Sequence, residues 1–266
     1  MTEKCVLIDS TDPAVTVITL NRPLKRNALS VQLLQELLAA LQSFSQESDR
    51  RVLILNANGP VFCAGLDLKE SADRENRQQS ADLLAGVYKT LVACPQVTIA
   101  AAQGAAIGGG VGLLSACDLA VVTDDMQIGF PEVKRGLVAA LVTALVRRQV
   151  NDRRLRELVL LGRTVSAVEA MSIGLVNQIT NSNELMAAAR ALAALAVQSA
   201  PLAVQRTKRL LDELSPRPIA EELDRAMRYH IEGRDSEEAI EGINAFLEKR
   251  EPRWPPMKGT DRSART

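Results

Sequence analysis

Short apolar strands alternate with helix-forming segments through the first half of this chain, and this alternation restricts the fold more than any other feature. Apolar runs that fit buried strands occur at 52–56, 98–102 and 118–123, with helical patterns between them. Only 3% of the residues are aromatic while 47% are hydrophobic, so the core must be built from aliphatic side chains. Alternation of this kind predicts an α/β fold with largely parallel strand pairing.

Two strands, 6–8 and 15–20, are predicted ahead of this region. Ser30 is typical of an N-cap and precedes an amphipathic helix over 31–45. Further helices are predicted at 82–93, after a polar stretch over 69–81, and at 108–116.

The pattern after Glu132 is purely helical. Helices are predicted at 138–148, 153–161, 167–173, 184–198, 202–214, 219–231 and 236–249. We therefore divide the chain into an α/β core over 1–198 and a helical oligomerisation region over 199–251. The proline-containing residues 252–266 are predicted to be a flexible tail.

Composition excludes several classes of function. The 32 basic and 32 acidic residues cancel, which argues against nucleic acid and anionic membranes as partners. The single histidine, His230, argues against a histidine-rich metal site and a Ser-His-Asp triad, and its polar surroundings predict a surface position. The four cysteines show no CxxC spacing and are expected to be reduced, buried thiols. We see no apolar leader and no uninterrupted spanning segment, and expect a cytoplasmic protein.

Two glycine-containing apolar segments follow predicted strands and are the strongest candidates for a functional site. The first covers 62–68, and the second covers 104–112 with three consecutive glycines. Glycine lets the backbone approach a ligand closely, and the second segment opens a helix whose first amides lack partners. Such amides suit a phosphate or a developing oxyanion, although tight helix–strand packing explains an isolated glycine run equally well. Neither segment matches a dinucleotide fingerprint or a P-loop.

Four motifs in order resemble the enoyl-CoA hydratase/isomerase (crotonase) family. They are NRPLKRNAL at 21–29, FCAGLDL at 62–68, AAIGGGVGLLSACDLAV at 105–121 and IGFPE at 128–132. The resemblance covers nearly the whole chain. It implies a spiral of β-β-α turns followed by a helical trimerisation region, assembled as a homotrimer or a dimer of trimers. It also implies an acyl-CoA substrate, with coenzyme A entering as part of that substrate, and no separate cofactor or metal.

The resemblance assigns roles to residues at matching positions. The backbone amides of Ala64 and Gly109 match the family's oxyanion hole, which holds the thioester oxygen. Positions that contact coenzyme A in the family match Lys25, Arg26, Leu66, Leu68, Phe246 and Lys249, the last two often reaching a neighbouring subunit's ligand. Lys25 and Arg26 are equally well explained as a solvated surface pair.

Glu132 matches a glutamate that transfers protons in the family. Two-glutamate hydratases carry a second acid in the glycine run, where this chain has Gly112 in what we expect to be the acyl pocket. Three functions therefore stay open. An enoyl-CoA hydratase-type lyase with one acid/base is the leading interpretation, and a Δ3-Δ2 enoyl-CoA isomerase is nearly as well supported. A CoA-binding homologue with little catalysis is the third.

Overall fold

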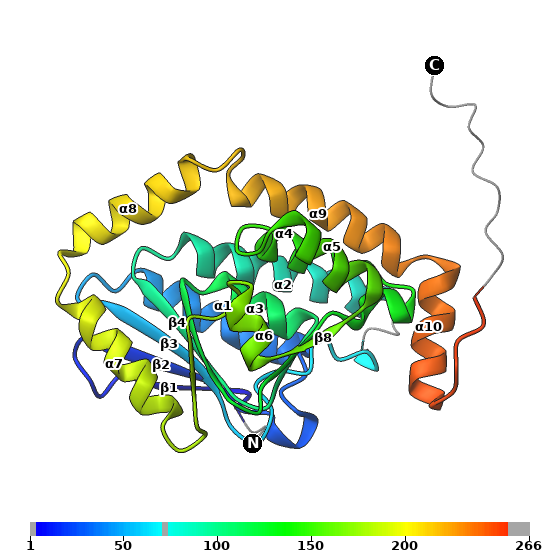
Figure 1. The fold of residues 1–266 in the computed structure, drawn as a ribbon, viewed down its shortest axis with the longest axis horizontal. Coiled ribbons are helices and arrows are strands. Elements are labelled where there is room, and N and C mark those ends of the chain that lie inside the picture. The colour runs from blue at the N-terminus through cyan, green and yellow to red at the C-terminus, as the bar shows by residue number, and fades with distance from the viewer. Residues whose placement is uncertain (1–3, 71–73, 255–266) are drawn as a thin grey trace.

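The main sheet of this protein has six strands in a computed structural model, which describes residues 4–70 and 74–254 (Figure 1). In spatial order they are β1 (Val6–Asp9), β2 (Val15–Leu20), β3 (Val52–Ala57), β4 (Val97–Ala102), β6 (Leu119–Thr123) and β9 (Gln178–Thr180). β1 pairs antiparallel with β2, and every other neighbouring pair is parallel. The predicted α/β fold with largely parallel pairing is confirmed.

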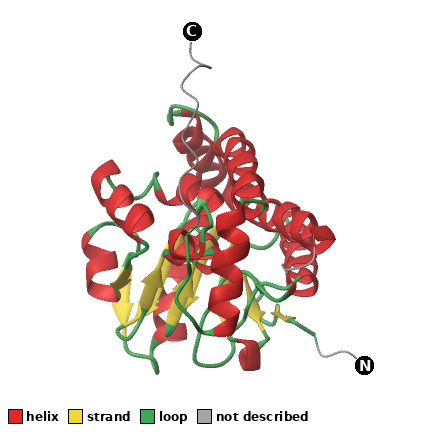
Figure 2. Ribbon diagram, turned by 90° about the vertical axis from the view of Figure 1, so that its right-hand side faces the viewer, coloured by secondary structure: helices red, strands yellow, loops and turns green. Residues whose placement is uncertain are grey.

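Helices cover both faces of this sheet, as Figure 2 shows. Successive residues of a strand point to opposite faces, so β3 contributes to two apolar clusters. Leu53 and Leu55 belong to the larger core with α1 (Val31–Ser45) and α2 (Arg74–Ala93). Val52 and Ile54 pack in a smaller cluster with α7 (Leu185–Val197). Burial on both faces explains why the strands are almost continuously apolar in sequence.

The helices of the first half are α1 (Val31–Ser45), α2 (Arg74–Ala93) and α3 (Gly109–Ala116). The cap prediction for α1 is confirmed, because Ser30 Oγ accepts a hydrogen bond from the Leu33 amide at 3.2 Å. The later helices are α4 (Ala140–Val146), α5 (Asp152–Leu161), α6 (Ala167–Ser172), α7 (Leu185–Val197), α8 (Pro201–Glu213), α9 (Ile219–Arg234) and α10 (Glu237–Glu248). Two 3-10 turns, η1 (Pro23–Lys25) and η3 (Pro131–Arg135), lie beside the site described below.

A second, three-stranded sheet brings the two glycine segments together. Its strands are β5 (Ala105–Ile107), β7 (Gln127–Gly129) and β8 (Thr164–Ser166). An isolated bridge between Cys63 and Ala106 joins the first segment to β5, and another joins Leu29 to Leu66. These short pairings hold the FCAGLDL segment against the start of α3.

The C-terminal helices form an arm over the core. In Figure 1, α8 and α9 run along the top of the view and α10 descends at its right side. α9 packs against α4 and α2, and α10 packs against η3. α8 buries none of its residues, and it exposes Leu202, Leu210 and Leu211.

Several expectations need correction. The second half is not purely helical, because β8 and β9 lie within it, and their three-residue length leaves no readable period. α2 begins at Arg74 rather than at 82, since its first turns are polar and lack an apolar stripe. The proposed tail lies largely in 255–266, outside the described residues. The division at residue 198 stays a prediction.

All four cysteines are buried, as expected. Among the described helices, no single one is long and apolar enough to cross a membrane, and α7 with α8 passes only as a bent pair judged by length and composition.

Candidate active site

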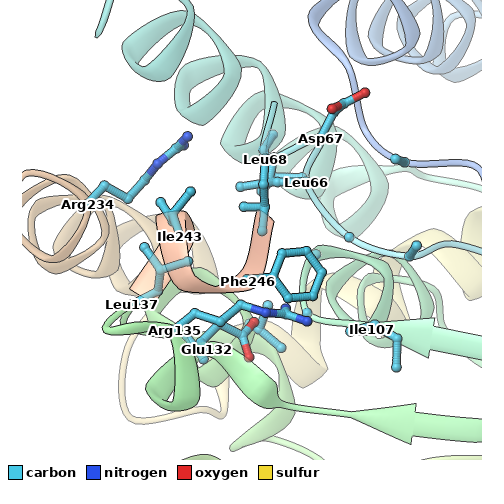
Figure 3. Close-up of a pocket in the computed structure, with 18 of the residues that line it drawn as sticks. Leu66, Asp67, Leu68, Ile107, Glu132, Arg135, Leu137, Arg234, Ile243 and Phe246 are labelled. Atoms are coloured by element: carbon cyan, nitrogen blue, oxygen red, sulfur yellow. The ribbon is translucent and has the colours of Figure 1, made fainter. Parts of the chain in front are cut away.

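A cavity of about 460 Å³ lies between the glycine segments and the C-terminal helices (Figure 3). Its walls come from residues 64–70, 107–109 and 137–142, and from α9 and α10. Glu132 lies in its wall next to the start of α3. A cavity of this size is typical of a small-molecule site. Both glycine segments and Glu132 lie around it.

Two unpaired backbone amides meet at the wall of this cavity. Among the described residues, the amides of Leu66 and Gly109 donate no hydrogen bond. A Cβ built on Gly109 would lie 3.8 Å from the Leu66 nitrogen, so the two peptide groups are close neighbours. Paired donors at a helix start are suited to an oxyanion, which would compensate their missing hydrogen bonds.

The structure corrects one predicted donor. The amide of Ala64 donates to the carbonyl oxygen of Arg26 at 3.0 Å, so it is not available to a ligand. Gly65 then turns the chain with a φ of 88°, and the next amide, that of Leu66, is the one left free. The motif identified a segment that carries an unpaired amide, but only the backbone pairing identifies which amide it is.

Glu132 brings a partly buried carboxyl group to the same place. It follows Pro131 at the start of η3, and its Oε1 atom lies 2.8 Å from where a Cβ of residue 108 would stand. Gly108 is therefore required both for this close approach and for its φ of 51°. The buried Oε2 atom has no hydrogen-bond partner among the described groups.

Burial raises the pKa of Glu132 from 4.5 to about 7, opposed by its own backbone amide and by Arg135. The Arg135 guanidinium lies 4.2 Å from the centroid of the Phe246 ring. Because the pKa is close to neutrality, both protonation states of Glu132 are populated there, which suits a group that takes up and returns a proton.

The raised pKa of Glu132 predicts a pH-dependent stability. The folded state holds this proton up to about pH 7 and the unfolded state only to 4.5, so stability is lost as pH rises between these values. Relative to Glu132→Gln, the wild-type free energy of unfolding should fall by about 3 kcal/mol across this window. Urea denaturation of both proteins at pH 4.5 and pH 8 measures this difference. A constant difference would contradict the raised pKa.

Tyr88 occupies the space beside Gly112. A Cβ on Gly112 would lie 2.1 Å from the Tyr88 hydroxyl oxygen and 2.3 Å from its Cζ. Tyr88 is fully buried, and its hydroxyl donates to the Gly109 carbonyl at 2.7 Å. Gly112 does not line the cavity, which corrects its predicted place in the acyl pocket. A side chain at position 112 is excluded by Tyr88, a residue that the sequence did not single out.

A sequence model of the family described as enoyl-CoA hydratase/isomerase matches residues 10–256. The chain belongs to the enoyl-CoA hydratase/isomerase family. It is an enzyme of that family, and the predicted crotonase-like fold with a helical C-terminal region is confirmed.

Relatives of known name and structure agree with this assignment. A putative enoyl-CoA hydratase of Thermus thermophilus is 36% identical over 246 residues, which cover 90% of this chain and 97% of that protein. A structure of EchA1_1 from Mycobacterium paratuberculosis has a TM-score of 0.85 at 34% identity, covering 95% of this chain and 99% of that one. A carnitinyl-CoA hydratase from Mycobacterium avium gives 0.84 at 32% identity, with coverage of 95% and 99%.

The positions that the family resemblance assigned to coenzyme A divide into two groups. Lys25, Leu66, Leu68 and Phe246 line the cavity. Arg26 and Lys249 do not line it, and both have left-handed backbone conformations at the ends of η1 and α10. The roles of all six stay predictions.

Arg22, which was not predicted as a site residue, lines the cavity and pairs with Asp67 at 3.3 Å. Asp67 therefore forms an ion pair at the edge of the FCAGLDL segment. This pair lies beside Lys25 and Lys69 in the cavity lining.

The prediction for His230 is wrong. His230 is only 9% exposed and lines the cavity, because the face of α9 that carries it packs against α4 and α2. The same face carries Arg234, which is 3% exposed and also lines the cavity. α9 looks polar in sequence because its buried face includes charged side chains. Among the described residues no group of three or more metal-ligating side chains occurs.

Proposed function

We propose that this enzyme is an enoyl-CoA hydratase-type lyase, with the amides of Leu66 and Gly109 as its oxyanion hole and Glu132 as its acid/base. The observation that carries this proposal is the convergence of two unpaired amides with the partly buried Glu132 carboxyl group in one cavity. A donor of this kind is worth about 2.7–4 kcal/mol of transition-state stabilisation.

In the proposed reaction, the Glu132 carboxylate accepts a proton from water as the water oxygen bonds to C3 of a conjugated enoyl thioester. The electron pair of the C2–C3 double bond moves toward the thioester oxygen, and the two amides stabilise the resulting enolate. The Glu132 carboxyl group then delivers its proton to C2. The sum is the addition of one water molecule, and the carboxylate is regenerated.

Isomerisation of a 3-enoyl thioester is the second candidate, and the Tyr88–Gly112 contact favours it. Tyr88 excludes a carboxylate from position 112, so the second acid of the two-glutamate hydratases is missing there and Glu132 remains as the proposed acid/base. A single carboxylate moves a proton from C2 to C4 through the same enolate, without a water molecule. The same amides and the same Glu132 serve both reactions.

We propose that coenzyme A enters past Lys25 and Leu68, where the cavity lining carries basic side chains, and that no further cofactor takes part. The exposed leucines of α8 support assembly as a homotrimer or dimer of trimers, which solution mass would test. A cytoplasmic location is part of the same proposal, to be checked by cell fractionation.

A substrate pair tests the reaction. The enzyme is mixed with a 2-enoyl-CoA and, separately, with its 3-enoyl isomer, and the absorbance of the conjugated thioester is followed. Hydration removes this absorbance from the first substrate, whereas isomerisation creates it from the second. If both thioesters bind and neither reacts, the protein is a CoA-binding homologue and the catalytic proposal fails.

A further inference from the structure

One end of the cavity carries buried polar groups that the proposed reaction does not use. His230 and Arg234 lie one turn apart on α9 and both line the cavity. They are 9% and 3% exposed, which is unusual for these residue types. In Figure 3, Arg234 lies with Ile243 and Leu137 on the side of the cavity away from Asp67.

The charge of Arg234 has no ion-pair partner in the described parts of the chain. Its Nη1 atom contacts the Arg77 carbonyl and Ser80 Oγ, both at 3.3 Å, and His230 Nε2 at 3.5 Å. Its Nη2 atom has no hydrogen-bond partner within 4–70 and 74–254. The neighbouring carboxylate, Asp235, pairs instead with Arg77 at 2.9 Å.

Both side chains have defined charge states at neutral pH. Burial lowers the pKa of Arg234 to about 10, helped by Arg77 and opposed by Asp235, so the guanidinium stays charged. Burial and the Arg234 charge lower the pKa of His230 to about 4, so this ring is neutral and its Nε2 can accept from Arg234. The end of the cavity thus holds one net positive charge from these two side chains.

Apolar side chains form much of the lining of this cavity, and Leu137 and Ile243 lie on the same side as Arg234 in Figure 3. Leu84, Leu137, Leu141 and Ile243 line the same cavity, and they offer the guanidinium no hydrogen bond. A buried charge is costly unless a hydrogen-bonded opposite charge accompanies it. A ligand that brings an anionic group to this end would compensate that cost.

We propose that Arg234 forms an anion subsite for the acyl group, so that the enzyme selects acyl-CoA thioesters whose acyl chain ends in a carboxylate. This inference rests on the proposed function for the orientation of the ligand, with coenzyme A at the Lys25 side. The Arg234 guanidinium donates to the carboxylate, and the apolar walls hold the methylene groups between that carboxylate and the thioester.

Saturated thioesters test the subsite without turnover. Calorimetry compares butyryl-, valeryl- and hexanoyl-CoA with succinyl-, glutaryl- and adipoyl-CoA, which match them in length but end in a carboxylate. At the best length, the carboxylate-ended thioester should bind about 10- to 100-fold more tightly. Arg234→Met should remove that preference and leave the methyl-ended thioesters unchanged. Arg228→Met, an exposed arginine on the same helix, is the control and should keep the preference.

Several outcomes would overturn the subsite. It fails if the wild-type protein binds both series equally at every length, a result that does not depend on any variant folding. It also fails if Arg234→Met weakens both series alike, or weakens free coenzyme A, because the guanidinium would then serve the fold or a CoA phosphate.

The two proposals fail separately. Selective binding of carboxylate-ended thioesters without turnover of their enoyl forms would remove the proposed function and keep the subsite. Turnover of methyl-ended enoyl thioesters without that selectivity would do the reverse.

Discussion

Replacing Glu132 with Gln is expected to lower kcat by about 10²- to 10⁴-fold, with little change in KM for the CoA thioester. Glutamine keeps the shape of the side chain beside Gly108, so the unpaired amides of Leu66 and Gly109 remain available to the thioester oxygen. What is lost is the proton transfer, since an amide does not take up or return a proton at neutral pH. Steady-state kinetics on the substrate that the enzyme turns over measures this split.

The matched control for this variant is Glu221→Gln, an exposed glutamate in the first turn of α9. It should retain full kcat. Wild-type turnover by Glu132→Gln would exclude Glu132 as the acid/base. A loss confined to KM would show instead that Glu132 contributes to ground-state binding.

Introducing the acid found in two-glutamate hydratases, as Gly112→Glu, is expected to damage the fold rather than to create a second acid. The first side-chain atom would meet the Tyr88 hydroxyl at 2.1 Å inside the core. Overpacking and the burial of a carboxylate together should cost about 3–5 kcal/mol. For a chain of this size, that corresponds to a drop in Tm of about 10 °C, measurable by calorimetry.

A double-mutant cycle that combines Gly112→Ala with Tyr88→Ala tests whether the contact between these two residues causes the loss of stability. Gly112→Ala alone should destabilise the protein, because its Cβ meets the same ring. In the Tyr88→Ala background, the substitution should become neutral or stabilising, since alanine favours a helix by about 1 kcal/mol over glycine. Urea denaturation of the four proteins gives the coupling energy.

Gly86→Ala in α2 is the control for that cycle, because its Cβ would meet only the flexible end of Leu38, at 3.3 Å. Equal effects of Gly112→Ala in both Tyr88 backgrounds would show that Tyr88 is not what excludes a side chain at position 112.

Much of the fold follows from local patterns in the sequence. Apolar runs predict β3, β4 and β6 because a strand buried on both faces needs apolar residues at every position. The 3.6-residue period and Ser30 predict α1, because capping and amphipathicity are properties of neighbouring residues. β8 and β9 escape such reasoning, since three residues form a strand only when a partner strand is already in place.

The candidate site could be predicted less completely. The motifs located the two glycine segments and Glu132, but they indicated Ala64 as a donor, whose amide is occupied by Arg26. The polar sequence around His230 likewise predicted a surface position, whereas this residue is buried. Both errors concern long-range contacts that a motif does not record.

Local patterns were enough to predict the α/β order of elements in the first half, the family and the segment of chain that carries each motif, because these depend on neighbouring residues. The tertiary structure alone decided which amides are unpaired, that Tyr88 excludes a side chain at position 112, and that Arg234 faces the cavity. Each of these depends on residues distant in sequence. Hydrogen bonds and steric exclusion act between groups in space, so the packing of α9 and α2 had to be known first.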